Sequence, residues 1–225
     1  MRLWCRLPIL TLILCAIASG FHPADAVRLS CSDSQVEFES DGTGDFGCVC
    51  ETTQDALTFL KSIGLETSRR VVVRLVEHIP SRQNHIILGA YNPNSQEVTL
   101  VTYPKALELA KKSPMFGIEL SQELWCSYAA HELAHVVSSQ HINPKIKTHT
   151  AGEYISAVTQ FTVLPSKMRQ LILKKYQDIP AYKYREEMSE LYFLLDPIKF
   201  TVKSYLHFIN QKNPKKFIDK LIKEG

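Results

Sequence analysis

The chain has 225 residues, of which 45% are hydrophobic, and a formal net charge of +3 at pH 7. This length is enough for one domain with a sizeable core. The nearly neutral charge argues against nucleic acid as the main partner.

The first 26 residues have the features of a signal peptide. Arg2 and Arg6 give a positive start, and the apolar run LPILTLILCAIA that follows is too short to span a membrane. Cleavage is expected after Gly20 or after Ala26, and an uncleaved anchor is the alternative. We therefore predict an exported protein, periplasmic or secreted, with no stable membrane insertion after cleavage. Residues 27–225 are predicted to form a single domain.

Four cysteines remain after the signal peptide, at positions 31, 48, 50 and 126. An even number in an oxidising compartment predicts two disulfides, for which three connectivities exist. Cys48 and Cys50 are too close in sequence to pair easily with each other. Cys31 is therefore expected to bond to one of them and Cys126 to the other. A metal site made by these cysteines is a weaker alternative, because one Cys-x-Cys pair carries little information.

The N-terminal half is predicted to contain one helix and a small sheet. Residues 32–47 are polar and are expected to be irregular. Thr52 or Thr53 is expected to cap a helix that ends at Gly64. The β-branched run RRVVVRLVEHI predicts a strand, and residues 85–103 predict a hairpin around the turn NPNS. A short helix over PKALELAKKS follows.

The C-terminal half is predicted to be mostly helical. Ser121, with Glu123 in the first turn, predicts the start of a longer helix that runs to about Gln140. Further helices are predicted over residues 151–164, 166–176, 184–195, 198–210 and 214–223. The order is an N-terminal helix, a small antiparallel or mixed sheet, a central helix and a helical C-terminal half. This order predicts an α+β fold rather than a parallel α/β fold.

The central helix carries the motif His-Glu-x-x-His, as His131, Glu132 and His135. Two histidines four residues apart share one helix face, so they can hold one metal ion between them. The apolar residues around the motif indicate a buried helix, in which histidines need partners. Zinc is expected, because it suits two imidazoles with a carboxylate or a third imidazole. Core histidines satisfied by other groups are the alternative.

One candidate for a third metal ligand is His141, which fits the metzincin spacing His-Glu-x-x-His-x-x-Gly-x-x-His. Ser138 stands where that pattern has glycine, and nothing in SSQH indicates the sharp helix end that the glycine allows. A helix that continues to Gln140 would turn His141 away from the metal.

Glu153, which follows His135 by 18 residues, is the other main candidate and corresponds to a gluzincin-type site. Glu153 could instead cap its own helix in a capping box with Thr150. Gly152 would allow a close helix approach, and the apolar flanks direct the carboxylate into the fold, where a cation is needed. We therefore prefer Glu153, with Glu190 as a fallback.

Three segments, HELAHVV, AGEYISAVTQF and LLDPIKFTVKSYLHF, resemble a family of uncharacterised exported bacterial proteins. In that family a His-Glu-x-x-His helix is followed by a Glu-Tyr-[Ile/Leu] helix and a Pro-x-x-Phe-x-Val-x-x-Tyr-x-His-Phe segment. The resemblance spans roughly residues 48–210 and implies a zincin-like fold of the gluzincin type. It carries over His131, Glu132, His135 and Glu153, and it implies that His141 is incidental.

These residues predict a zinc metallopeptidase that acts on a peptide or protein substrate. Three protein ligands leave a position for water, and Glu132, roughly 100° round the helix from His131, can reach that water as general base. Tyr205, or else His207, is a candidate donor to the oxyanion, with ordinary packing as the alternative. The predicted hairpin could pair with an extended substrate. A non-catalytic, zinc-stabilised binding module is the alternative function.

Overall fold

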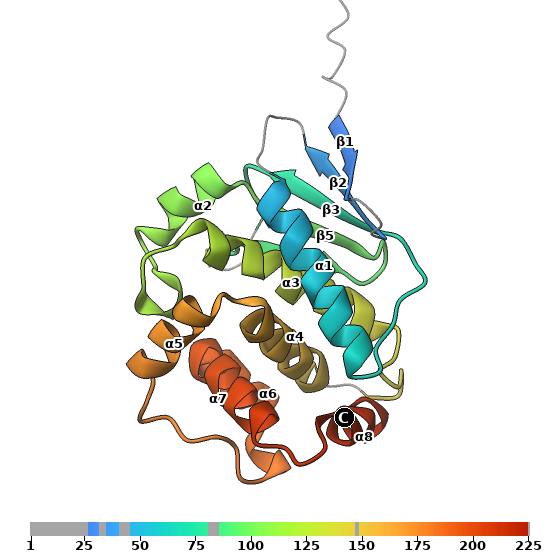
Figure 1. Cartoon of the computed structure of the whole chain (residues 1–225), viewed down its shortest axis with the longest axis vertical. Helices are drawn as coiled ribbons and strands as arrows, with labels where there is room; N and C mark the ends of the chain where they lie inside the picture. The colour runs from blue at the N-terminus through green and yellow to red at the C-terminus, as the bar shows by residue number, and fades with distance from the viewer. Residues whose placement is uncertain (1–26, 32–34, 41–45, 81–85, 147–148, 225) are drawn as a thin grey trace, which may run out of the picture.

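The structure is a computed structural model that describes residues 27–31, 35–40, 46–80, 86–146 and 149–224. A five-stranded sheet lies at one end of the molecule, and helices are stacked beneath it in successive layers (Figure 1). The predicted signal peptide lies outside the described residues. The coarse prediction of an α+β fold with a small mixed sheet and a mostly helical second half is confirmed.

The sheet has the strand order β1-β2-β3-β5-β4. Its strands are β1 (Val27–Ser30), β2 (Val36–Ser40), β3 (Val71–Val76), β4 (Gly89–Asn92) and β5 (Glu97–Val101). The three inner strands β2, β3 and β5 are parallel, whereas the edge strands β1 and β4 are antiparallel to their neighbours. As predicted, β4 and β5 form a hairpin, in which the side-chain oxygen of Asn92 accepts a hydrogen bond from the Asn94 amide at 2.9 Å.

The two faces of the sheet differ in polarity because side chains alternate along each strand. In β3, Val71, Val73 and Leu75 are buried on the helix side. Arg74 points to the other face, where its guanidinium lies 2.9 Å from the Glu39 carboxylate and 3.3 Å from that of Glu97. One arginine thus links the three parallel strands on the face away from the helices.

Two helices lie directly beneath the sheet, α1 (Gly47–Ser62) and α3 (Gln122–Ser139), with α2 (Tyr103–Ala110) beside them (Figure 1). As predicted, Ser121 caps α3, since its hydroxyl oxygen accepts a hydrogen bond from the Leu124 amide. From Leu124 to Val137 nearly every side chain of α3 is buried. The indole of Trp125 donates a 2.8 Å hydrogen bond to the Val101 carbonyl, which ties α3 to β5.

The next layer is α4 (Thr150–Val163), which packs against α3 on one side and α7 (Pro197–Ile209) on the other. The remaining helices are α5 (Ser166–Lys175), the short α6 (Glu190–Leu195) and α8 (Pro214–Glu224). Prolines begin α7 and α8 and follow α4, where their fixed φ and missing N–H suit a helix boundary. The layers from the sheet to α7 place α3 and α4 at the centre of the molecule.

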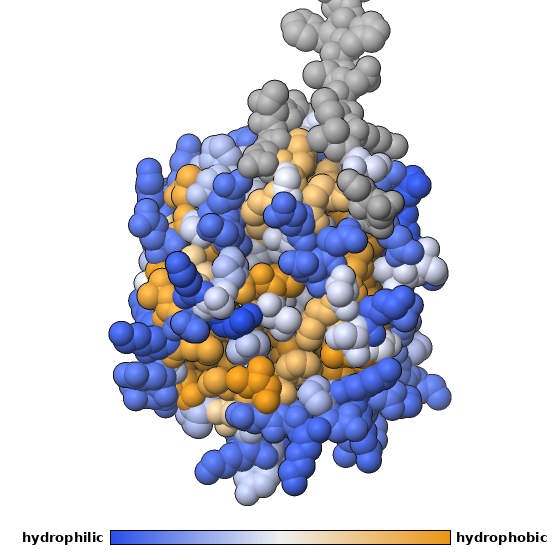
Figure 2. Space-filling model, in the orientation of Figure 1, coloured by the Kyte–Doolittle hydropathy of each residue, from blue (hydrophilic) through white to orange (hydrophobic). Residues whose placement is uncertain are grey.

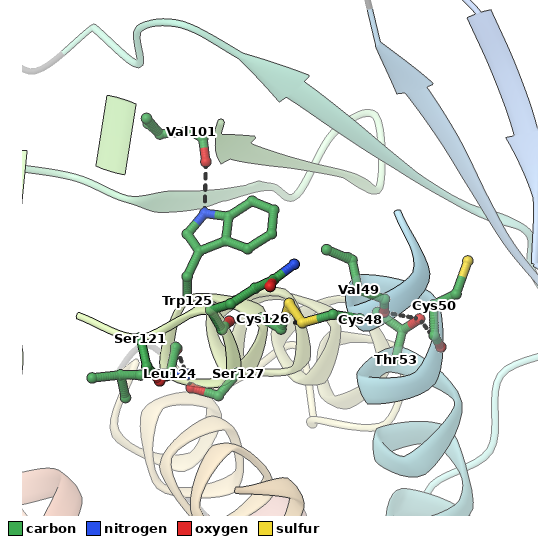
Figure 3. The surroundings of a disulfide bond; sticks show 11 residues. Cys48, Val49, Cys50, Thr53, Val101, Ser121, Leu124, Trp125, Cys126 and Ser127 are labelled. Carbon is green, nitrogen blue, oxygen red and sulfur yellow. Dashed lines mark hydrogen bonds between the residues drawn. A yellow bond between two sulfur atoms is a disulfide. The ribbon is translucent and has the colours of Figure 1, made fainter. Parts of the chain in front are cut away.

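Two disulfides connect the N-terminal segment, α1 and α3. Cys31 bonds to Cys50, and Cys48 bonds to Cys126. Figure 3 shows the surroundings of the second bond, where Cys48 at the start of α1 points toward Cys126 on α3, next to Trp125. The prediction of two disulfides, with Cys31 and Cys126 each bonded to one of the two close cysteines, is confirmed.

Three local predictions were wrong. Residues 32–47 are not wholly irregular, because Val36 and Phe38 alternate with polar residues and are buried in β2. Helix α1 begins at Gly47, so Thr53 lies inside it and donates to the Val49 carbonyl rather than capping it. The predicted helix 184–195 is a short 3₁₀ turn followed by α6.

Hydrophilic residues cover most of the outline of the surface, and apolar residues gather where Figure 1 places the C-terminal helices (Figure 2). The large apolar side chains that are exposed lie mainly on α5, α6 and α7: Leu171, Leu191, Leu194, Leu195 and Ile209. Within the described residues, no helix combines the length and apolar character needed to cross a membrane.

Candidate metal centre

A cleft of about 690 Å³ lies between β4, α3 and the start of α4. His131, Glu132 and His135 of α3 line it, and Glu153 of α4 lies on the opposite wall. Phe193 of α6 also lines the cleft. The fold therefore brings the motif residues of α3 to one site with the Glu153 carboxylate, which follows His135 by 18 residues in the sequence.

The possible ligand atoms of three side chains converge in this cleft. Nε2 of His131 lies 3.2 Å from Nε2 of His135. The Glu153 carboxylate oxygen Oε2 lies 3.7 Å from the first nitrogen and 3.6 Å from the second. A tetrahedral ion with ligand bonds of about 2.0–2.1 Å separates its ligand atoms by about 3.3 Å. In the described part of the chain, this cluster of His, Cys, Asp or Glu side chains is the one that could hold a metal ion.

The chemistry of the three groups also fits a cation. Two imidazole nitrogens that face each other at 3.2 Å can share at most one proton without repulsion, whereas both can direct lone pairs at a cation. Ligation through Nε2 places the ring proton on Nδ1. The Nδ1 atom of His131 is buried and makes no hydrogen bond within the described residues, so it is free to carry that proton.

Glu153 reaches the histidines because α4 begins close to α3. Position 152 is glycine, and a Cβ there would lie 3.3 Å from Nδ1 of His135. Gly152 was expected to let α4 approach another backbone, whereas its close neighbour is the His135 side chain. The alternative of a capping box is not confirmed, because α4 begins after His149 and no side-chain hydrogen bond caps it.

The electrostatics of the cluster follow from burial opposed by the neighbouring charges. Burial lowers the pKa of His131 to about 4. Burial also opposes the charge on His135 and Glu153, but their mutual attraction outweighs it, so the pKa of His135 is raised and that of Glu153 is lowered. Glu153 is therefore ionised and His131 is neutral near pH 7, which are the states that ligate a cation, whereas the raised pKa of His135 means that a cation would displace its proton.

Glu132 lies in the same cleft but is not one of the three converging groups. Its side chain is 8% exposed, and burial raises the pKa of its carboxyl to about 7. The main chain of β4 covers it at Gly89, and Tyr91 of the same strand stacks on His135 with the rings 7° from parallel. Sequence reasoning missed Gly89 and Tyr91. An isolated glycine in a strand, as in HIILGAY, was the available signal for a close backbone approach.

The other predicted site residues lie elsewhere. Tyr205 on α7 packs against the ring of Phe161, 5.0 Å between centroids, and beneath the guanidinium of Arg169. It does not line the cleft, so its position gives no support to an oxyanion role and fits the alternative of ordinary packing. His207 is hydrogen-bonded to the Tyr154 hydroxyl at 2.8 Å and to the Gln211 amide at 2.8 Å, also away from the cleft.

His141 and Glu190 are not part of the cluster. Nε2 of His141 lies 2.7 Å from the Glu66 carbonyl, so this ring is directed toward the loop after α1. Glu190 lies in the first turn of α6. The arrangement therefore favours Glu153 over both alternatives as the partner of the two histidines.

Comparison with known proteins assigns no activity. No curated protein and no solved structure matches the chain. A family model, described as "Family of unknown function (DUF6639)", matches residues 36–225, which include all of the cleft residues named above. The chain is thus a member of the DUF6639 family.

Proposed function

We propose that this protein is an exported zinc metallopeptidase of the gluzincin type. The observation that carries the proposal is the convergence of His131, His135 and Glu153 within 3.2–3.7 Å of one another in a cleft that also contains Glu132. A structural role for zinc would need the ligand set alone. A buried carboxylate next to that set, with its own access to the cleft, is what hydrolysis needs in addition.

The ligand set is the reason to name zinc. Two imidazoles and one carboxylate suit zinc, and three protein ligands are typical of catalytic sites. When bound there, zinc would polarise the scissile carbonyl and lower the pKa of a bound water to about 7.

Glu132 is the proposed general base. It follows His131 directly, so it lies about 100° round α3 from the first ligand and faces the cleft without joining the ligands. In the reaction, the water oxygen bonds to the carbonyl carbon while its proton passes to the Glu132 carboxylate. The carbon–nitrogen bond then breaks, and Glu132 returns the proton to the leaving amine.

The edge strand β4 supports a polypeptide substrate. It pairs with β5 on one side, and no described strand pairs with its other side. An extended substrate could add to this free edge through main-chain hydrogen bonds. The cleft beside β4 is lined by apolar side chains, including Ile87, Ile142 and Phe193. This combination suits an uncharged, extended segment of a peptide or protein.

The arrangement of elements supports the zincin-like part of the proposal. The metal helix α3 lies beneath the sheet, the antiparallel edge strand lies beside the motif, and the next helix supplies the glutamate. Export to the periplasm or the exterior is supported by the two disulfides, which persist in oxidising compartments.

The test is a peptide-library digest with zinc-loaded wild type, Glu132→Gln and chelator-treated wild type. The glutamine keeps the size of the side chain but accepts no proton, so hydrolysis should fall by roughly 10²–10⁴-fold with zinc content unchanged. Tyr205→Phe is the matched control and should cut like wild type, because Tyr205 lies outside the cleft. If wild type cuts no peptide that Glu132→Gln leaves intact, the protein is a zinc-stabilised binding module instead.

A further inference from the structure

The buried nitrogen of His131 that faces away from the cluster needs an acceptor. If Nε2 is the ligand, as in the proposed function, Nδ1 must carry the ring proton. A buried N–H without an acceptor costs about 1–3 kcal/mol. Metal-bound histidines usually donate this proton to a carboxylate or carbonyl oxygen, which also fixes the ring orientation.

Gln160 is a buried polar side chain that meets α3 one helical turn before His131, because its Nε2 lies 3.1 Å from Oγ of Ser127, four residues before His131. It lies on α4 seven residues after Glu153, so both side chains are on the helix face that meets α3. Its exposed fraction is only 2%. Gln160 also acts against the lowering of the His131 pKa by burial, which is the direction expected of an acceptor near the ring.

The direction of the amide is set by a chain of hydrogen bonds that begins at the backbone. The Ser127 hydroxyl donates its one proton to the Leu124 carbonyl at 2.6 Å. Ser127 Oγ can therefore only accept from Gln160, whose Nε2 lies 3.1 Å away. A flipped amide would bring its oxygen against the lone pairs of Ser127. The backbone carbonyl thus holds the Gln160 nitrogen toward Ser127 and leaves the Gln160 oxygen for His131.

We propose that Gln160 is a positioning residue whose amide oxygen accepts the Nδ1 proton of His131 and so keeps Nε2 available to the metal. In the structure Nδ1 of His131 has no hydrogen-bond partner among the described residues, and the Gln160 amide is held one helical turn away at Ser127. On this proposal, the Nδ1–H···O bond forms when the ring is drawn onto a cation. The tautomer preference is a property of the metal-free chain as well, so the inference rests on the proposed function only for its effect on metal affinity.

The experiment compares four variants of the disulfide-bonded protein by two measurements. The first is zinc affinity by competition with a chelator. The second is the tautomer of His131 in the metal-free protein at pH 7, from ¹⁵N NMR of labelled histidine. Gln160→Leu removes both amide functions at similar volume, and Gln160→Glu keeps an acceptor. Ser127→Ala removes the group that orients the amide. Ser156→Ala is the matched control, because it deletes a buried hydroxyl of the same helix that has no hydrogen-bond partner in the described residues.

The expected result is an ordered series. Gln160→Leu should bind zinc about 10–100-fold more weakly and should lose the preference for the Nδ1–H tautomer. Ser127→Ala should show a smaller change in the same direction, and Ser156→Ala none. Gln160→Glu should retain the tautomer and wild-type affinity or better. A side chain needed only for packing would give the opposite ranking, since leucine fills the apolar site and a buried carboxylate disturbs it.

The outcomes separate this inference from the proposed function. Wild-type zinc affinity and wild-type tautomer in Gln160→Leu would overturn the positioning role and leave the peptidase proposal intact. A wild type that binds no zinc, together with a tautomer shift in Gln160→Leu, would overturn the proposed function and support the positioning role. Should Gln160→Leu fail to fold, Ser127→Ala and Gln160→Glu decide, and unchanged tautomer and affinity in Ser127→Ala would count against the hydrogen-bond chain.

Discussion

The main chain at Gly89 lies directly against the side chain of Glu132. A Cβ at position 89 would lie 2.8 Å from Cγ and 3.0 Å from Oε1 of Glu132, which is too close for non-bonded heavy atoms. Strand and carboxylate can therefore occupy their present positions only because residue 89 has no side chain. Gly89 therefore sets how closely β4, the strand proposed to pair with the substrate, approaches Glu132, the proposed general base.

Gly89→Ala should lower peptide hydrolysis at least about ten-fold while zinc remains bound, because the new methyl group displaces the Glu132 carboxylate or the strand. Overpacking of this kind costs about 1–3 kcal/mol of stability. The measurements are hydrolysis of a peptide found in the library digest, metal content and thermal unfolding. Gly152→Ala is the comparison, because its methyl group would meet His135 instead and should weaken zinc binding. Full activity in Gly89→Ala would show that the contact is not needed.

Glu153→Ala should lose zinc, whereas His141→Ala should keep it. Removing one of three ligands should weaken binding by more than the ~10–100-fold typical of outer-shell losses. His141 contacts the Glu66 carbonyl instead, so its removal should cost about 1 kcal/mol of stability and no metal. Metal analysis of the purified variants checks this. Zinc retained by Glu153→Ala and lost by His141→Ala would place the protein with the metzincins.

Most of the helices, and the convergence of His131, His135 and Glu153, could be predicted from the sequence because they depend largely on local pattern. Ser121 marked the start of α3, and the four-residue spacing of His131 and His135 fixes their common face whatever the rest of the fold does. Glu153 was predictable from its surroundings, since a carboxylate between apolar residues needs a buried partner. These inferences need only the period of a helix and the cost of burying charge.

What the sequence could not supply was the result of non-local packing. Segment VEFES is short, and only its pairing with β1 and β3 makes it a strand with Val36 and Phe38 in the core. The contacts of Gly89 with Glu132 and of Tyr91 with His135 depend on where β4 crosses α3, so the isolated glycine signals a close approach but not its partner. Tyr205, in the segment KSYLHF, was predicted to act at the site, but its position on α7 directs its side chain toward Phe161.

The two disulfides should contribute unequally to stability. Cys48 and Cys126 are 78 residues apart, and Cys31 and Cys50 are 19 apart. In the chain-entropy description the longer loop gives the larger effect, about 4.5 kcal/mol against about 3 kcal/mol. The double variant Cys48→Ala/Cys126→Ala should therefore melt at a lower temperature than Cys31→Ala/Cys50→Ala. Non-reducing mass spectrometry establishes the pairing first, and equal melting temperatures would contradict the prediction.

In metal-free protein, the stability difference between Glu132→Gln and wild type should depend on pH. Burial raises the pKa of Glu132 from 4.5 to about 7. The folded wild type therefore binds this proton more tightly than the unfolded chain, so its unfolding free energy falls as the pH rises from about 4.5 to about 7. Glutamine has no proton to lose. The pKa shifts of the other titratable groups are common to both proteins, so their effects largely cancel in the difference between the two unfolding free energies.

Urea unfolding of both proteins with chelator, from pH 4 to pH 8.5, measures this difference. A shift of that size corresponds to about 3 kcal/mol, which Glu132→Gln should gain over wild type above pH 7 relative to pH 4. Zinc should shrink the gain, because a nearby cation stabilises the ionised carboxylate. A difference that does not change with pH would mean that Glu132 is solvated in the metal-free protein, and the close contact with Gly89 would then not persist in solution.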